Sequence, residues 1–250
     1  MKILLLWSLF LFLPDARAQA LEQAIARVKP AVVGIGSQLK TRTPAIQFIG
    51  TGFATGDGLS VLTCAHVIDK LLAANPGETI GILTAQGDAT QFRAAVVQAL
   101  DTEHDLALLR LSGTPLPTLP LGDADAVREG QAMAFTGFPL GMLLGLRHVT
   151  HRAVISALTP VVIPSENALR LDPKRLAQLQ KAPYTVFQLD ATAYPGNSGS
   201  PLFDPDSGLV YGIVNMVYVK GLKEAAVSAP SGITYAIPAS HMQALLLKNR

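Results

Sequence analysis

Short apolar runs separated by Gly, Pro, Asp and Asn follow one another along most of the chain. Runs that end at such turn residues are typical of β-strands. A first set of strands is predicted at Ala31–Gly36, Ile46–Thr55, Ser60–Thr63, Thr79–Leu83, Phe92–Val97 and Leu106–Leu111. A second set is predicted at Ala132–Thr136, His148–Leu158, Thr185–Leu189, Ser200–Phe203, Leu209–Val219 and Ile233–Ile237. Many short strands with turns between them predict an all-β fold of two antiparallel six-stranded barrels rather than alternating βαβ units.

Helical patterns are expected only at the two ends of this strand region. Apolar residues recur at helical spacing in Leu21–Val28, which predicts a short amphipathic N-terminal helix. Ser240–Lys248 has an N-cap serine and an apolar row, which predicts a C-terminal helix packed across the barrels. The proline-rich stretch Gly113–Pro120 predicts a connector, because prolines cannot donate to a strand ladder. The expected bounds are about 31–112 for the first barrel, about 130–238 for the second and about 240–248 for the helix.

One stretch, Pro164–Pro183, interrupts the second set of strands. It places leucines among charged residues, and Asp172-Pro173 is a suitable start for a short helix over Lys174–Lys181. We expect an inserted surface excursion between two strands. A lid, a partner surface and a loop without a function of its own all fit this pattern.

The first twenty residues have the pattern of a secretory signal peptide. The apolar run Ile3–Leu13 precedes the small-residue ending Ala18-Gln19-Ala20, and we expect cleavage after Ala20. The run is too short to span a membrane comfortably, and no later stretch reaches that length. A buried N-terminal helix is the alternative. The sequence thus predicts an exported protein, bacterial periplasmic or extracellular, with no stable membrane insertion after cleavage.

Composition narrows the function classes. Hydrophobic residues make up 49% of the chain and charged residues 15%, as in globular proteins. A formal net charge of +2, without a Lys/Arg cluster, predicts no nucleic-acid partner. Cys64 is the single cysteine, so an exported chain has no internal disulfide, which favours a bacterial setting. We expect Cys64 to be a buried structural thiol, with a zinc ligand as the alternative.

The stretch Tyr194–Pro201 places Ser198 in a polar turn between Gly196 and Gly199. Glycines let the backbone fold closely around a hydroxyl, and such a turn can aim two N–H groups at one point. A serine hydroxyl is a weak nucleophile unless a base takes its proton and donors stabilise the oxyanion that forms. The turn therefore directs the search upstream, to a base and a carboxylate.

His66 lies within the apolar run Leu62–Ile68, and Asp105 opens the apolar run of the sixth predicted strand. The chain order of histidine, aspartate and serine matches the chymotrypsin order and differs from the subtilisin and α/β-hydrolase orders. The competing carboxylates are Asp69, Asp101 and Asp190. We prefer Asp105 because a strand that starts immediately after it would bury it against the histidine.

Four motifs carry a family resemblance: Thr63–Val67, His104–Leu109, Pro195–Leu202 and Ile233–Pro238. With them the chain resembles the chymotrypsin-like (trypsin-like) serine peptidases, most closely the HtrA-type bacterial branch. The resemblance runs from about Ala31 to about Leu247 and implies one trypsin-like protease domain in residues 21–250. Two features depart from the pattern. Ser200 stands where the family usually has a second glycine, and no PDZ domain is expected after the barrels.

The resemblance implies roles for the three residues. His66 would take the proton of Ser198 and later give it to the leaving amine, and Asp105 would orient the imidazole. The N–H groups of Gly196 and Ser198 would form the oxyanion hole. The implied activity is that of a secreted or periplasmic serine endopeptidase, which forms an acyl-enzyme on protein or peptide substrates without a cofactor. The alternative is a protease-like binding module with a gated or inactive oxyanion hole; an esterase of another fold fits the triad order poorly.

Alignment to the family places the borders of the primary substrate pocket at Thr192, Ile213, Val214, Asn215 and Met216. None of these residues is acidic, which disfavours Lys or Arg substrates and favours a small or medium apolar side chain. Asn197 replaces the aspartate with which zymogen-activated relatives bind a new N-terminus, so we expect no activation of that kind.

The remaining histidines are scattered along the chain. They lack metal-ligand spacing, and we predict surface or turn positions for them and no metal site. They are His104, His148, His151 and His241. The sequence does not indicate the oligomeric state.

Overall fold

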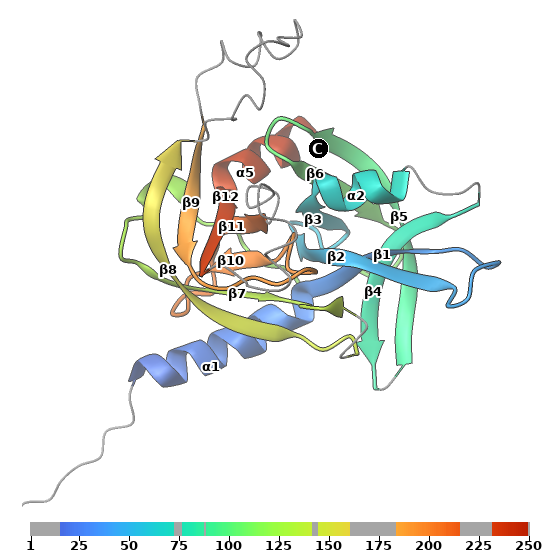
Figure 1. Ribbon diagram of the computed structural model, residues 1–250, viewed down its shortest axis with the longest axis horizontal. Coiled ribbons are helices and arrows are strands. Elements are labelled where there is room, and N and C mark those ends of the chain that lie inside the picture. Colours follow the sequence, from blue (N-terminus) through green and yellow to red (C-terminus); the bar gives the residue numbers. More distant parts are fainter. Residues whose placement is uncertain are drawn as a thin grey trace, which may run out of the picture.

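The computed structural model describes residues 16–72, 77–87, 89–141, 145–160, 184–215 and 232–249. Within them the chain folds into two closed antiparallel barrels of six strands each, side by side (Figure 1). The strand order is β1-β2-β3-β6-β5-β4 in the first barrel and β10-β11-β12-β9-β8-β7 in the second. The predicted fold class is confirmed.

The strands of the first barrel are β1 (Val32–Gln38), β2 (Ile46–Thr55), β3 (Ser60–Cys64), β4 (Thr79–Gln86), β5 (Ala89–Asp101) and β6 (Leu106–Leu111). Those of the second are β7 (Ala132–Gly137), β8 (Val149–Pro160), β9 (Thr185–Asp190), β10 (Pro201–Phe203), β11 (Val210–Asn215) and β12 (Ile233–Pro238). All twelve predicted strands are present. β5 runs from Ala89 to Asp101 where Phe92–Val97 was predicted, and the described ends of the other strands differ by at most three residues. The last four residues predicted for the eleventh strand and the whole of Pro164–Pro183 lie outside the described residues.

Each barrel is filled by side chains from its own strands. Phe53, Leu62 and Leu108 are buried in the first barrel, and Phe135 and Phe203 in the second. A large apolar side chain that is fully buried contributes roughly 1.5–3 kcal/mol to stability. These cores fix the barrels, and the barrels in turn position the loops at their junction.

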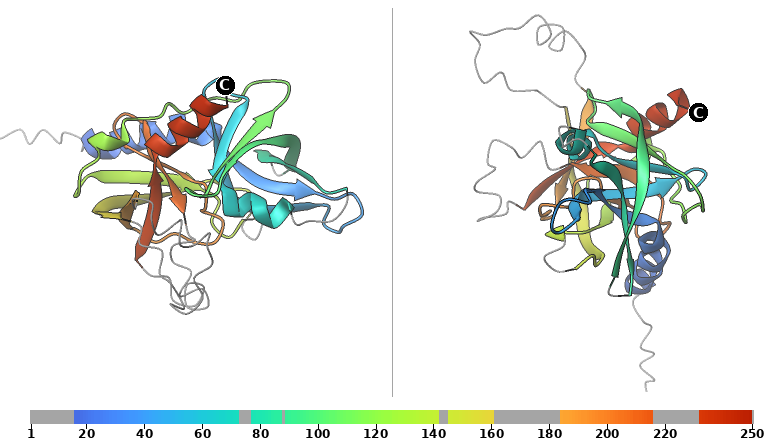
Figure 2. Two further views of the ribbon diagram at one scale, coloured as in Figure 1. Left: turned by 90° about the horizontal axis from the view of Figure 1, so that it is seen from above. Right: turned by 90° about the vertical axis from the view of Figure 1, so that its right-hand side faces the viewer.

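Two helices flank the barrels. The first, α1 (Ala16–Val28), buries Ala24 and Val28 and begins before the expected cleavage position, so the predicted N-terminal helix is present and longer. Residues 1–15 lie outside the described part. The C-terminal helix α5 (Ala239–Lys248) contacts β6 of the first barrel and β11 and β12 of the second, and Figure 2 shows it over their junction.

A third helix, α2 (Ala65–Leu72), was not predicted, and the expectation of helices only at the ends is wrong. The apolar run Leu62–Ile68 contains both the end of β3 and the start of α2. Val67, Ile68 and Leu71 are buried, and their spacing of one and three residues suits a helix face. An apolar run of seven residues is too short to separate these two elements by periodicity.

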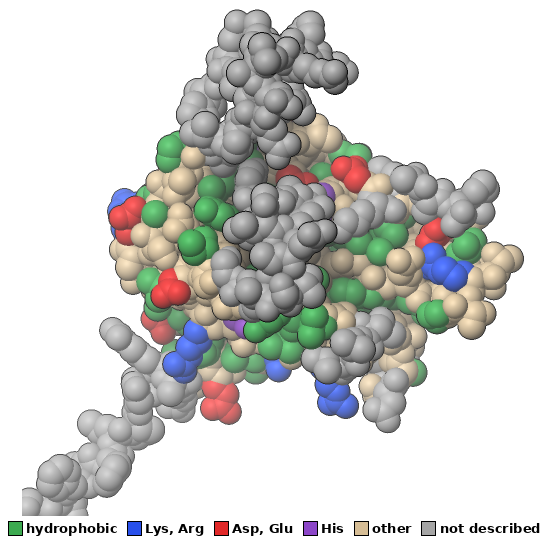
Figure 3. Space-filling view, viewed as in Figure 1, with side chains coloured by type: hydrophobic (Ala, Val, Ile, Leu, Met, Phe, Trp, Pro, Cys, Tyr) green, Lys and Arg blue, Asp and Glu red, His purple; other side chains and the backbone are tan. Residues whose placement is uncertain are grey.

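The surface of the described residues carries no segregated charge in the view of Figure 3, where acidic and basic side chains lie scattered over the face shown. Among the described helices, none combines the length and the apolar character that crossing a membrane requires.

Candidate active site

His66 and Asp105 lie side by side at the edge of the first barrel. His66 is in the first turn of α2, and Asp105 immediately precedes β6. His66 Nδ1 is 2.6 Å from Asp105 Oδ2, and the His66 backbone N–H donates to Oδ1 at 2.7 Å. An ionised carboxylate only accepts hydrogen bonds, so a neutral imidazole in this position carries its proton on Nδ1 and leaves the lone pair of Nε2 free. The pair can therefore offer a base through Nε2.

The backbone of Asp105 is held in an unusual conformation. Its φ is +53°, a region that residues other than glycine seldom adopt, although aspartate does so more often than most. The Asp105 carbonyl accepts from the Ala65 N–H at 3.0 Å. Carboxylate and carbonyl together satisfy two free N–H groups at the start of α2, where negative charge also interacts favourably with the helix dipole. The same residue thus caps the helix that carries His66.

Asn215 provides the third hydrogen bond to this carboxylate. Its Nδ2 donates to Asp105 Oδ2 at 2.7 Å from the end of β11, so the bond crosses from the second barrel to the first. We predicted Asn215 as a border of the substrate pocket. The structure shows its side chain, which is buried, directed to Asp105.

In the turn that carries Ser198, every backbone carbonyl oxygen from Tyr194 to Ser198 accepts a hydrogen bond. The oxygens of Tyr194, Pro195, Gly196, Asn197 and Ser198 accept, in that order, from Asn197 N, Leu140 N, Thr51 Oγ1, Ser200 N and Thr51 N. The N–H groups of Gly196 and Ser198, by contrast, have no acceptor among the described residues. Among the described residues these two backbone donors thus have no acceptor, and they flank a serine that is buried, with 7% of its surface exposed.

The orientation of one peptide unit follows from these bonds. A trans peptide is planar, and its carbonyl and N–H point in opposite directions. Leu140 N donates to the Pro195 oxygen at 2.7 Å, so the Gly196 N–H faces away from Leu140. Gly196 has φ +102°, and a Cβ there would lie 2.3 Å from the Phe138 carbonyl oxygen. Only glycine fits this turn as it stands.

Thr51 on β2 links the turn to the first barrel, and we did not predict a role for it. Its N–H donates to the Ser198 oxygen at 2.9 Å, and its Oγ1 donates to the Gly196 oxygen at 2.7 Å. The same Oγ1 accepts from Phe138 N at 3.1 Å. A threonine between two glycines in a strand has no pattern that marks it in a single sequence.

A second link places the Ser198 turn beside the segment that leads to His66. The Val214 carbonyl accepts from Gly199 N at 2.9 Å and from the Cys64 thiol at 3.4 Å. Gly199 follows Ser198, and Cys64 precedes His66 by two residues. The junction of the barrels thus places the segments that carry the three motifs side by side.

Of the residues predicted to border the primary pocket, Thr192 is partly buried, whereas Ile213 and Val214 are buried completely. Met216 lies outside the described residues. Of the described residues predicted for this pocket, Thr192 is therefore the one with surface that a substrate could contact.

The competing carboxylate Asp101 serves a different cluster. Its Oδ2 is 2.7 Å from His104 Nδ1. Burial alone would raise the pKa of Asp101, but the hydrogen bonds and charge of His104 outweigh it and hold that pKa below its usual value. The His104 ring stacks on His241 with centroids 3.9 Å apart, and Tyr184 meets both rings edge-on.

The other two histidines are also partly buried rather than free on the surface. His148 Nε2 lies 2.8 Å from the Val32 oxygen, and His151 stacks on Phe135 at 4.8 Å. Burial lowers the pKa of each of these histidines.

Cys64, His66 and Asp105 each offer one potential metal-ligand atom within 4.8 Å of the others. Burial, with a further contribution from the charge of Asp105, raises the pKa of the Cys64 thiol well above its usual value. A metal binds the thiolate rather than the thiol, so this environment disfavours a metal. The buried thiol that we predicted fits these contacts, and His66 and Asp105 already engage each other.

Comparison with known proteins identifies the family of this chain. The model of the trypsin-like peptidase domain family matches residues 50–213, a span that contains His66, Asp105 and Ser198. A probable periplasmic DegP-like serine endoprotease of Halomonas elongata is 31% identical over 191 residues, 76% of this chain and 32% of the relative. A protein of the same description from Pseudomonas fluorescens is 30% identical over 193 residues, 77% of this chain and 33% of the relative. The chain thus spans about a third of the length of these relatives.

Solved structures share the fold. Deg5 superposes with a TM-score of 0.65 at 22% identity over 91% of this chain and 92% of its own. The HtrA-type protease AlgW with a tripeptide superposes with a TM-score of 0.62 at 23% identity over 91% of this chain and 62% of its own.

Proposed function

Since the chain belongs to the trypsin-like peptidase domain family, we propose that it is a serine endopeptidase that uses His66, Asp105 and Ser198. One observation carries the proposal: the Ser198 turn leaves the N–H groups of Gly196 and Ser198 without an acceptor, across the barrel junction from a histidine whose Nδ1 is bound by a carboxylate. These are the parts that acyl transfer from a peptide requires.

The proposed reaction begins when the Ser198 oxygen attacks the scissile carbonyl carbon. His66 Nε2 takes the hydroxyl proton as the C–O bond forms, and Asp105 stabilises the imidazolium that results. The tetrahedral intermediate collapses when the C–N bond breaks and His66 gives its proton to the leaving amine. Water, activated by the same imidazole, then hydrolyses the acyl-enzyme and regenerates the serine.

The oxyanion of the tetrahedral intermediate would accept hydrogen bonds from Gly196 and Ser198. Removal of one such donor generally costs about 10²–10³ in rate. The alternative is a binding module with a gated or inactive oxyanion hole, in which these donors are turned away or occupied. No carbonyl of the described residues accepts from them, and the bond from Leu140 N to the Pro195 oxygen supports the open arrangement.

The substrate and the location follow from the relatives and the predicted leader. The relatives are named periplasmic endoproteases, and one structural neighbour is described with a tripeptide. We infer a protein or peptide substrate and export to the periplasm, after cleavage of the predicted signal peptide behind Ala20.

The test compares three proteins produced without Met1–Ala20: the wild type, Ser198→Ala and the control Ser156→Ala. Ser156 is exposed on β8, distant in sequence from the proposed site. We expect the wild type and the control to hydrolyse casein and to react with a fluorophosphonate probe, and Ser198→Ala to do neither. A folded wild type that neither cleaves nor labels would refute the endopeptidase and favour the binding module.

A further inference from the structure

Asp105 is the last residue of a short loop between β5 and β6, and Asp101, the last residue of β5, holds this loop. The Asp101 Oδ1 atom accepts from the backbone N–H groups of Glu103 at 3.2 Å and of His104 at 3.1 Å. The other carboxylate oxygen, Oδ2, is 2.7 Å from His104 Nδ1. His104 is thus bound to Asp101 through both its backbone and its ring, one residue before Asp105.

The remaining ring contacts of His104 come from segments much later in the chain. The ring of His241, in the first turn of α5, stacks on it with centroids 3.9 Å apart and 22° between the ring planes. Tyr184, directly before β9, meets both rings edge-on, with centroids 4.7 Å from His104 and 5.2 Å from His241. We call these three side chains the ring cluster. It holds His104 from the side opposite its own loop, and α5 also contacts β6, which follows the loop (Figure 1).

The backbone of Asp105 needs support because its conformation is unfavourable. Its φ of +53° is one that residues other than glycine keep only where the surroundings impose it. The carbonyl and carboxylate of Asp105 are bound by Ala65, His66 and Asn215. On the N-terminal side, His104 is the neighbour whose position is fixed. A shift of His104 would therefore turn Asp105 relative to His66 Nδ1, which lies 2.6 Å from its Oδ2.

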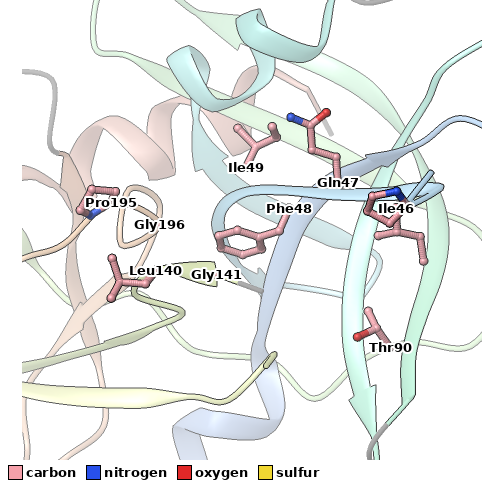
Figure 4. Close-up of a pocket in the computed structure, with 10 residues that line it drawn as sticks. Ile46, Gln47, Phe48, Ile49, Thr90, Leu140, Gly141, Pro195 and Gly196 are labelled. Carbon is pink, nitrogen blue, oxygen red and sulfur yellow. The ribbon is translucent and has the colours of Figure 1, made fainter. Parts of the chain in front are cut away.

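The ring cluster does not belong to the cavity beside the serine turn. Figure 4 shows that cavity, of about 630 Å³, with Phe48, Leu140 and Gly196 among the residues on its walls. None of its described lining residues is a member of the cluster. Loss of the cluster therefore leaves these walls in place and acts on Asp105. A defect that acts on the reaction rather than on binding lowers kcat and changes KM little.

We propose that His104 and His241 are positioning residues, whose stack holds the loop of Asp105 in the conformation that the reaction needs. The inference rests on the proposed endopeptidase function and adds to it a contact outside the triad. It makes the rate depend on how α5 is seated, because α5 carries one of the two stacked rings. A purely structural stack would contribute to stability and leave kcat per folded molecule unchanged.

The test removes and then restores the ring on α5, away from the Asp105 loop. We expect His241→Ala to lower kcat about tenfold and to keep KM within about twofold, because a small displacement of a catalytic group can cost about 10² in rate. His241→Phe should recover most of the lost kcat, since its ring can take the same place in the stack. The measurement is kcat and KM on a peptide that Ser198→Ala does not cleave, corrected for the folded fraction by circular dichroism.

A second variant covers the case in which His241→Ala folds poorly. His104→Asn keeps a side-chain donor for Asp101 but has no ring, and it should lower kcat in the same way. The control is Gln243→Ala, two residues further along α5. It removes a different bond of this helix, from Gln243 Nε2 to the Gly122 oxygen at 3.2 Å, and should leave kcat unchanged.

The outcomes separate the positioning role from the proposed function. A folded His241→Ala variant with the wild-type kcat would overturn the positioning role alone. An equal loss of kcat in Gln243→Ala would also overturn it, because any loosening of α5 would then have the same effect. A wild type that cleaves neither casein nor peptides would overturn the proposed function and the positioning role with it.

Discussion

Asn215 and Asp105, which are 110 residues apart in the chain, share a hydrogen bond of 2.7 Å between the two barrels. The bond fixes the carboxylate oxygen that also holds His66 Nδ1. Hydrogen bonds to charged groups contribute about 1.5–3 kcal/mol, and an acceptor that loses one reorients or takes up water. Asn215 is thus a positioning residue for the proposed base.

Asn215→Ala should lower kcat by about tenfold and leave KM nearly unchanged, since 1.4 kcal/mol in the barrier is a factor of ten. Asn215→Asp should lower kcat further, because it places a second carboxylate against the first. Kinetics on a peptide that Ser198→Ala does not cleave would measure both. If the alanine variant folds and keeps the wild-type kcat, the side chain has no part in catalysis.

Thr51 holds the Ser198 turn to the first barrel through a hydroxyl that both donates and accepts. Thr51→Val keeps the shape and removes these bonds, which should lower the free energy of unfolding by about 1–3 kcal/mol. It should also lower kcat, because the Gly196 carbonyl loses its anchor.

Thr55→Val is the matched control for Thr51. Thr55 is buried on the same strand and donates to the Leu119 oxygen at 2.8 Å, but does not contact the serine turn. Both variants should show reduced stability in urea, and only Thr51→Val should lose activity per folded molecule. If the two variants have equal activity per folded molecule, Thr51 contributes to stability and not to the activity of the serine turn.

Ser200 replaces a glycine of the family pattern, and its buried Oγ has no hydrogen-bond partner among the described residues. A buried hydroxyl without a partner costs about 1–3 kcal/mol. We expect Ser200→Ala to raise the free energy of unfolding by about 1 kcal/mol, which urea denaturation would measure. Ser200→Gly should be less stable than Ser200→Ala, because glycine loses more backbone freedom on folding. A clear loss of stability in the alanine variant would show that the hydroxyl is bonded in solution.

The protonation of His241 makes the free energy of unfolding depend on pH. Burial, with the nearby His104, lowers the pKa of His241 to about 4, against an ordinary value of 6.5. Between these values the unfolded chain binds a proton that the folded chain does not, so stability falls as the pH falls from about 6.5 toward about 4. At pH 7 and above this contribution is fully present.

His241→Gln removes the titrating group and should flatten this dependence. Urea unfolding at pH 7.5 and pH 5 should show a smaller loss in the variant than in the wild type. The remaining loss has other sources, among them His148 and His151, whose pKa values are shifted in the same direction. If the variant and the wild type lose the same free energy of unfolding between these pH values, His241 does not contribute to the pH dependence.

Local patterns were sufficient for the fold, and chain order is the basis on which His66, Asp105 and Ser198 are proposed as the triad. Ile46–Thr55 and Leu106–Leu111 have the predicted bounds, because turn residues follow each of them along the chain. The start of α2 was not predictable in the same way, since a helix and a strand adjoin within one apolar run. The stack of His104 on His241 joins residues far apart in the chain, and periodicity holds no information on such contacts.

The support around the triad was predicted least well. Thr51 acts on Gly196 across 145 residues, through a single hydroxyl. Asn215 was expected in the substrate pocket, and its bond to Asp105 depends on how the two barrels pack against each other. Chain order and spacing select the residues that we propose for the chemistry, whereas the residues that position them depend on three-dimensional packing.

The hydrogen bonds from Thr51 to Gly196 and Ser198 and from Asn215 to Asp105 all cross the barrel junction. Neither half of the chain contains a complete reaction centre by itself. On the proposed function, a newly synthesised chain gains proteolytic activity only after both barrels have folded and docked, when its own strands are no longer accessible as an unfolded substrate. Any change that separated the two barrels would, on the proposed function, abolish activity even if each barrel kept its own fold.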